Sequence, residues 1–163
     1  MKNAASCASA EPVLMGMSPR ELSRPFGLEL GKTQIRDLEE EFVITCNQGT
    51  GFTKGPVLQV IQRYVEEPEA ECIVLAFDEK GLLDAAWFNL PADQFQVAAK
   101  AMTEAFELVD MNSPIKGSES ALFKFCDCEV ALHSPLFSKE MTVGYRTIKF
   151  NNARMASAAE SYE

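Results

Sequence analysis

Basic residues are scarce in this sequence, and their scarcity excludes two classes of partner. Fifteen Lys and Arg side chains stand against twenty-four Asp and Glu side chains, so the formal net charge is −9 at pH 7. Binding to phosphate backbones depends on clustered positive charge, and we therefore expect no nucleic-acid partner. The acidic balance also disfavours a membrane surface, and no apolar run approaches the roughly 20 residues that span a bilayer. We expect no membrane partner.

A secretory signal and a disulfide framework are also missing. The segment MKNAASCASAEPVLMGM at the N-terminus has one lysine and no apolar stretch before Glu11 and Pro12, unlike a signal peptide. The five cysteines are odd in number and irregular in spacing, which argues against paired disulfides: Cys7, Cys46, Cys72, Cys126 and Cys128. We therefore predict a cytoplasmic protein with reduced thiols.

The composition that remains is that of a globular domain. The chain has 163 residues, of which 47% are hydrophobic, enough for one domain with a core of its own. Residues 1–17 are small and polar without periodicity and predict a flexible arm. Residues 18–150 are expected to form a single α+β domain, and residues 151–163 a flexible or frayed helical tail.

Hydrophobic spacing predicts the elements of that domain. Apolar residues at helical spacing after Pro56 predict an amphipathic helix near 56–64, and a second helix is expected from Asp93 to about Val109. The runs CIVLAF (72–77) and LLDAAWFNL (82–90) flank the turn residues DEKG and predict a β-hairpin. Two more strands are expected at 121–133 and 141–150. The fold class that we expect is α+β, an antiparallel sheet built from hairpins with two amphipathic helices packed on it.

A glycine-rich loop at residues 48–55 partly matches a phosphate-binding motif. In GTGFTKG the third glycine comes one position later than G-x-G-x-x-G requires. A phosphate site would use Gly49, Gly51, Lys54 and the N-terminus of the expected helix, but Pro56 has no N–H to donate there. We interpret the loop as a connection and predict no cofactor. A nucleotide-binding enzyme that uses this loop is one alternative.

Residues for catalysis or metal binding form no complete pattern. Cys126 and Cys128 are two residues apart on an expected strand and point to the same face, and no C-x-x-C pair exists to complete a metal site. We interpret them as buried free thiols. His133, the only histidine, stands at an expected strand end without a nucleophile motif. We predict no metal site and no catalytic residue.

Two features favour binding to a protein. Trp87 and Phe88 are adjacent on one expected strand, so their side chains face opposite ways and only one can enter the core. The other is expected in an apolar contact surface. Acidic clusters include Glu39 and Glu40, and Glu66 and Glu67, which are candidates for electrostatic contact with a partner.

The order of expected elements resembles a known family. The stretch ECIVLAFDEKGLLDAAWFNLPADQFQVAAKAMTEAF is similar to the strand, D-x-x-G turn, strand and long helix of the Roadblock and dynein light chain family, within the profilin-like and longin-like group. The resemblance covers residues 56–150. It implies a non-catalytic scaffold that dimerises through its sheet edge or helix and binds a small GTPase or a larger assembly.

These observations favour a non-catalytic cytoplasmic interaction or scaffold module that forms a homodimer, binds a protein partner, or both. A second hypothesis is an acidic chaperone or immunity-type inhibitor of a basic client protein. Binding to such a client would weaken steeply with salt.

Overall fold

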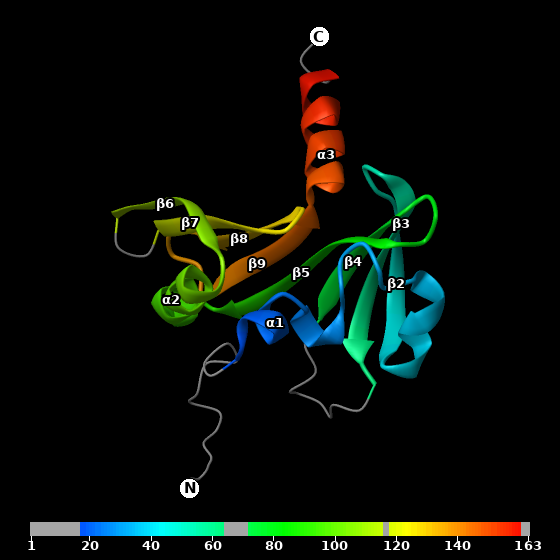
Figure 1. The fold of residues 1–163 in the computed structure, drawn as a ribbon, viewed down its shortest axis with the longest axis horizontal. Helices are drawn as coiled ribbons and strands as arrows, with labels where there is room; N and C mark the ends of the chain where they lie inside the picture. The colour runs from blue at the N-terminus through cyan, green and yellow to red at the C-terminus, as the bar shows by residue number, and fades with distance from the viewer. Residues whose placement is uncertain (1–16, 64–71, 116–117, 161–163) are drawn as a thin grey trace, which may run out of the picture.

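One eight-stranded antiparallel sheet organises the computed structural model, which describes residues 17–63, 72–115 and 118–160 (Figure 1). The strand order is β2-β3-β4-β5-β9-β8-β7-β6. Two four-stranded meanders therefore join through the pairing of β5 with β9. The strands are β2 (Phe42–Thr50), β3 (Lys54–Gln62), β4 (Ile73–Asp78), β5 (Leu83–Pro91), β6 (Glu107–Ile115), β7 (Ser118–Phe125), β8 (Cys128–Ser134) and β9 (Glu140–Thr147).

Short helical segments accompany the sheet. The α-helices are α1 (Pro19–Leu22), α2 (Phe95–Ala105) and α3 (Ile148–Glu160), and the 3-10 helices are η1 (Pro25–Gly27), η2 (Ile35–Glu40) and η3 (Ala92–Gln94). Across the described ranges, none of the helices is both long and apolar enough to cross a membrane.

The expected fold class is wrong in its balance of sheet and helix. The segment after Pro56 was expected to be one of two amphipathic helices packed on the sheet, but it is strand β3, paired with β2 on one side and β4 on the other. Val57, Val60 and Ile61 fit a helical face, yet Leu58 and Val60 are buried while Gln59 and Ile61 are half-buried, which is the alternation of a strand. The resulting molecule is dominated by its sheet.

Other boundaries also differ from the expectation. The predicted β4–β5 hairpin is confirmed, and Asp78 closes its turn by accepting hydrogen bonds from the N–H groups of Lys80 and Leu82. Helix α2 is confirmed but ends at Ala105, and the following residues start the edge strand β6. The expected strand 121–133 is divided into β7 and β8 by a turn at Cys126, which has a φ of 50°. The expected strand 141–150 is divided between β9 and the start of α3.

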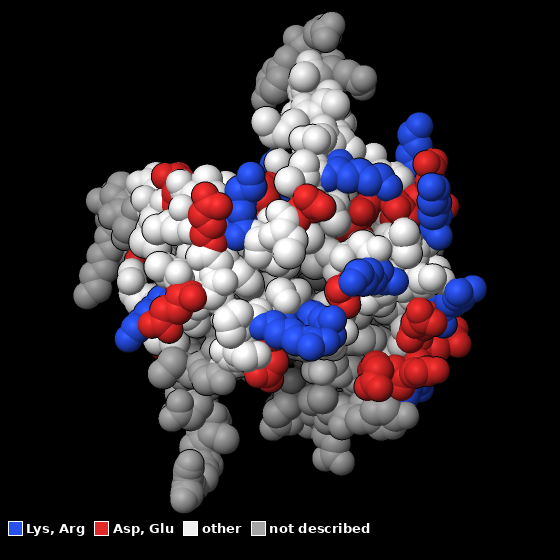
Figure 2. All heavy atoms as spheres, in the orientation of Figure 1, with Lys and Arg blue, Asp and Glu red and all other residues white. Residues whose placement is uncertain are grey.

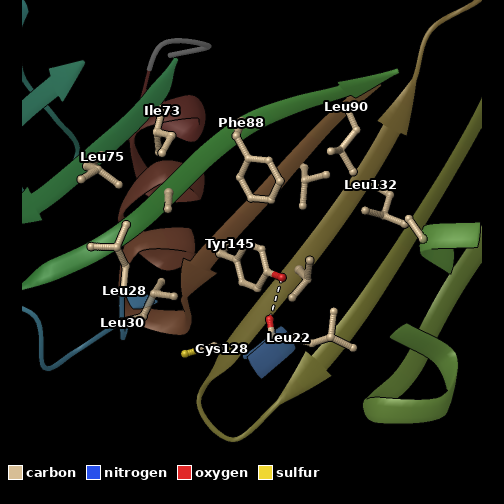
Figure 3. Packing of buried hydrophobic residues seen from close by; sticks show 14 of the residues in the cluster. Leu22, Leu28, Leu30, Ile73, Leu75, Phe88, Leu90, Cys128, Leu132 and Tyr145 are labelled. Carbon is tan, nitrogen blue, oxygen red and sulfur yellow. Dashed lines mark hydrogen bonds between the residues drawn. The ribbon is translucent and has the colours of Figure 1, made fainter. Parts of the chain in front are cut away.

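One face of the sheet carries the hydrophobic core, covered by α1, α2 and the segments around η1 and η2 (Figures 1 and 3). Phe88, Val143 and Tyr145 point into this core. The Tyr145 hydroxyl donates a 2.7 Å hydrogen bond to the Leu22 carbonyl and so ties α1 to β9. Burial raises the pKa of Tyr145 above its ordinary value.

The opposite face of the sheet, called the open face below, is the side from which α3 projects (Figure 1). A second, smaller cluster lies there and contains Ala76, Ala85 and Phe150, with Val57 and Trp87 packed against it. Phe150 is in the first turn of α3, so this cluster fixes the base of that helix to the sheet.

Candidate interaction surface

A single line of residues crosses the open face from edge to edge. The registers of the seven strand pairs place the following residues opposite one another in sequence: Asp110, Leu122, Ala131, Gly144, Trp87, Val74, Gln59 and Cys46. Residues directly opposite in a ladder share a face of the sheet. The middle of this line, from Leu122 to Val74, is apolar, whereas Asp110 and Gln59 flank it with polar groups. The open face therefore has an apolar band with a polar border, the pattern of many protein interfaces.

Trp87 lies across Gly144 on the neighbouring strand. A Cβ atom at position 144 would stand 2.8 Å from the indole Cδ1, closer than atoms pack, so only glycine lets the ring take this position. The ring also makes an edge contact with Phe150 of α3, with ring centroids 5.5 Å apart. Trp87 is half-buried as a result. The indole is therefore an apolar part of the open face, packed between Gly144 and Phe150.

The base of α3 is fixed by polar contacts as well as by Phe150. The Lys149 ammonium lies 2.8 Å from Asp78 Oδ2. Thr147 caps the helix by accepting a hydrogen bond from the Phe150 N–H, and its hydroxyl donates to the buried Asp84 carboxylate. A carboxylate at a helix N-terminus is also favoured by the helix dipole.

The ion pair at the helix base has opposite effects on its two members. Burial alone would raise the pKa of Asp78, but hydrogen bonds from Lys149 and from the Leu82 and Lys80 N–H groups together lower it. The hydrogen bond to Asp78 raises the pKa of Lys149. Both groups are therefore charged at neutral pH, and the base of α3 is held in place there.

Beyond its base, α3 presents an exposed stripe. Asn152, Met155, Ala156 and Ala159 follow the i, i+3, i+4, i+7 spacing of one helical face, and all four are exposed. The Met155 side chain is 58% exposed. A methionine flanked by alanines on an accessible helix is suited to contact with another apolar surface.

Polar pairs border the apolar band along the strands. Arg146 Nε lies 3.3 Å from Glu129 Oε1, across the β8–β9 ladder. On the opposite border of the band, the Thr142 hydroxyl lies 3.3 Å from Asn89 Oδ1, across the β5–β9 ladder. His133 on β8 is exposed on the same border.

Between these polar pairs, the small residue Ala131 stands between two larger side chains. Leu122 is opposite Ala131 on β7, and Gly144, which is opposite Ala131 on β9, lies under the indole of Trp87.

The structure separates the two aromatic residues proposed for partner contact. Phe88 is 6% exposed and belongs to the core, where its ring packs against Phe26 and Tyr145. Trp87 is on the open face. Of the acidic candidates, Glu39 and Glu40 are exposed on η2, and Figure 2 shows acidic side chains gathered over that part of the molecule. Glu66 and Glu67 lie outside the described residues.

The glycine-rich loop lacks the helix that a phosphate site was expected to use. Gly49 and Thr50 end β2, Gly51 stands at the turn, and Lys54 and Gly55 begin β3. Gly55 instead serves packing, since a Cβ atom there would collide with the carbonyl oxygens of Phe77 and Asp78 on β4. The Phe52 ring at the turn contacts Phe150 at a centroid distance of 5.7 Å. The loop therefore borders the base of α3.

The thiols and the histidine are dispersed. Cys128 is buried as expected, but Cys126 is in the β7–β8 turn and is exposed, so the interpretation of both as buried thiols is wrong for Cys126. Within residues 17–63, 72–115 and 118–160, no three His, Cys, Asp or Glu residues gather as metal ligands would. Cys7 lies outside this part of the chain.

Sequence reasoning expected a flexible or frayed helical tail at residues 151–163, but it did not predict that a helix begins at Ile148 and is fixed to the sheet, and it missed the glycine under Trp87. Residues 148–150 were assigned to the preceding strand, because MTVGYRTIKF is one β-prone run. Gly144 within a strand pattern was an available signal, since such a glycine often marks a close approach by another group.

Comparison with family models, with curated proteins and with solved structures finds no match to this chain.

Proposed function

We propose that this protein is a non-catalytic cytoplasmic interaction module that works through the open face of its sheet. The observation that carries the proposal is α3, which is fixed to the sheet by its first turn and exposes Asn152, Met155, Ala156 and Ala159 beside an apolar band. Apolar residues that stay accessible in this arrangement favour contact with another protein surface. The free thiols at Cys46, Cys72, Cys126 and Cys128 suit a reducing compartment.

Two measurements on the full chain test this proposal together. Size-exclusion chromatography with light scattering reports self-association, and recovery of proteins from native lysate by the tagged chain reports other partners. We expect a dimer, a specific partner, or both. A strict monomer that recovers no protein above a tag-only control would contradict the proposal.

An acidic chaperone or inhibitor of a basic client is the second candidate. Asp37, Glu39, Glu40 and Glu41 are exposed within one short segment, which supports it. Affinity for such a client should fall steeply between low and high salt, because exposed charges are screened over about 8 Å at physiological ionic strength. Recovery of a partner that resists high salt would favour the apolar open face instead.

A further inference from the structure

We propose that an apolar pocket between η1 and η2, called the η1–η2 pocket below, receives an arginine side chain of a protein partner. The pocket has a volume of about 380 Å³. Its apolar lining includes Phe26, Leu28, Leu38 and Phe42, and its charged lining is Asp37 and Glu41. The inference rests on the second function proposed above, binding to a basic client, and names the group of the client that this protein recognises.

The two walls of the pocket are held in place by the rest of the fold. On the η1 side, Phe26 has a φ of 57°, which is unfavourable for a residue with a Cβ atom, and its ring meets Phe88 of the core at a centroid distance of 4.9 Å. On the η2 side, Leu38 is buried and the Ile35 N–H donates a 2.9 Å hydrogen bond to the Gly81 carbonyl. The pocket is therefore formed before a ligand arrives, and binding does not have to order it.

Asp37 and Glu41 bring two unpaired negative charges to this pocket. Both residues are exposed, and within the described part of the chain neither carboxylate makes an ion pair or a hydrogen bond. The guanidinium of Arg63 reaches the same segment, but it donates to the carbonyl oxygens of Glu39 and Phe42, at 2.9 and 3.3 Å. The charge of the two carboxylates is therefore available to an incoming cation.

An apolar wall beside two carboxylates matches a side chain that has an aliphatic stem and a cationic end. Lysine and arginine both lay their stems along apolar surface and keep the charged end among polar groups. Arginine fits this pocket better, because its planar guanidinium bonds carboxylates through parallel N–H donors and stacks on aromatic rings. The pocket places Phe26 and Phe42 beside Asp37 and Glu41. The lysine ammonium is compact and more strongly hydrated, so we expect arginine to be preferred.

The surroundings of the pocket favour a basic partner over longer distances. The net charge of the chain is −9, and Glu39 and Glu40 are exposed on the same short segment, where Figure 2 shows acidic side chains gathered. Surface charge of this kind speeds the encounter with an oppositely charged protein but does not fix where it binds. The pocket supplies the fixed point, since only there do carboxylates adjoin an apolar wall that can hold a stem.

A capped Gly-Gly-Arg-Gly-Gly peptide tests the pocket on the full chain. The peptide is titrated into the ¹⁵N-labelled protein, and amide chemical shifts are followed by NMR. We expect saturable shifts at millimolar peptide, confined to the amides around η1 and η2. The same peptide with lysine should bind more weakly. A peptide with citrulline, which keeps the shape of arginine without its charge, should produce no saturable shift.

Neutral substitutions show whether the two carboxylates of the pocket act specifically. Asp37→Asn and Glu41→Gln should each lower the affinity for the arginine peptide by about fivefold, the upper range for an accessible ion pair. Glu39→Gln and Glu40→Gln are the matched controls, because they remove the same charge from the same segment outside the pocket. These controls should lower the affinity by less than about twofold, since screened charges at a distance contribute little. Circular dichroism should be unchanged in all four variants.

Three results would overturn the assignment of the pocket. These are the absence of saturable shifts, equal binding of the citrulline peptide, and equal losses of affinity in all four variants, which would indicate general attraction to an acidic segment. If the chain in that case still recovers a basic client from native lysate in a salt-sensitive manner, the second proposed function stands and only its recognition site is wrong. If no such client is recovered either, that function fails together with the pocket.

Discussion

At the scale of single residues, small side chains decide where large ones can lie. The Trp87 indole crosses β9 because Gly144 has no Cβ, and β3 approaches β4 closely because Gly55 has none. The sequence predicted that Trp87 and Phe88 face opposite ways, since alternation is a local property of a strand. It did not predict which of them is buried, because that depends on which face α1 and α2 cover.

Gly144→Ala should displace the indole. The new methyl group would overlap the Trp87 ring and force it away from Phe150, at a cost of about 1–3 kcal/mol for overpacking. Trp87 is the only tryptophan, so its fluorescence reports the change directly. We expect a red-shifted emission maximum and a lower urea midpoint, and an unshifted spectrum would show that the ring does not depend on Gly144.

Gly55→Ala should destabilise the sheet by about 3 kcal/mol, since the added methyl group meets backbone carbonyls that cannot move aside without breaking the ladder. Gly49→Ala is the matched control. Position 49 is open but has a φ of +106°, so alanine there costs backbone strain of about 1 kcal/mol. If urea unfolding showed the same loss of stability in Gly55→Ala and Gly49→Ala, the close approach of β3 and β4 would be contradicted.

Cys128 should react slowly with iodoacetamide. Burial, with smaller contributions from negative charge at Cys126, Asp127 and Asp84, raises the pKa of Cys128 from 9.0 to about 11. At pH 8 its thiolate fraction is then about 100-fold below that of an ordinary thiol. Peptide mass spectrometry should show the exposed Cys46, Cys72 and Cys126 modified first.

Because the folded-state pKa of Cys128 is raised, the stability contributed by its neutral thiol is present below pH 9 and is lost as the pH rises through about 11.

At the scale of elements, pairing with other strands decided the structure of a segment whose local spacing predicts a helix. The segment at Val57–Ile61 satisfies helical spacing, but the two neighbouring strands give it more hydrogen bonds and buried surface as β3. No side chain caps α2, which begins at Phe95 after η3. The β4–β5 hairpin and α2 were nevertheless predictable, because the DEKG turn and the apolar spacing of the helix indicate them locally. Helix α3 was not, because its anchoring residues, Asp78, Asp84 and Trp87, come from distant parts of the chain.

Phe150→Ala should detach α3 from the sheet. The Phe150 ring is 2% exposed and packs among Ala76, Ala85 and Trp87, and truncating such a ring costs about 3–5 kcal/mol. We expect lower stability together with increased solvent exposure of Trp87, detected by acrylamide quenching. A loss of stability with Trp87 quenching unchanged would contradict the placement of α3 on this face.

At the scale of the whole molecule, one uninterrupted sheet has one covered face and one open face. Pairing of β5 with β9 joins residues as distant as Ala85 and Arg146, and such long-range pairing leaves no local mark in a sequence. For this reason the expected fold class, with two amphipathic helices packed on the sheet, was wrong, although the β4–β5 hairpin within it is confirmed. The apolar line from Leu122 to Val74 emerges only from this pairing, so the candidate surface could be predicted from the sequence in part, through Trp87, but not as a whole.

Photocrosslinking from position 155 tests the central claim most directly. A photoreactive amino acid replaces Met155 in chains grown with natural nitrogen, and these are mixed with ¹⁵N-labelled native chains and irradiated. Heavy–light adducts identify contacts between molecules, and mass spectrometry locates them. The proposed interaction module predicts adducts from position 155 with a second copy of the chain or, when native lysate is added, with another protein. Absence of both kinds of adduct would contradict an interaction through α3 and the open face.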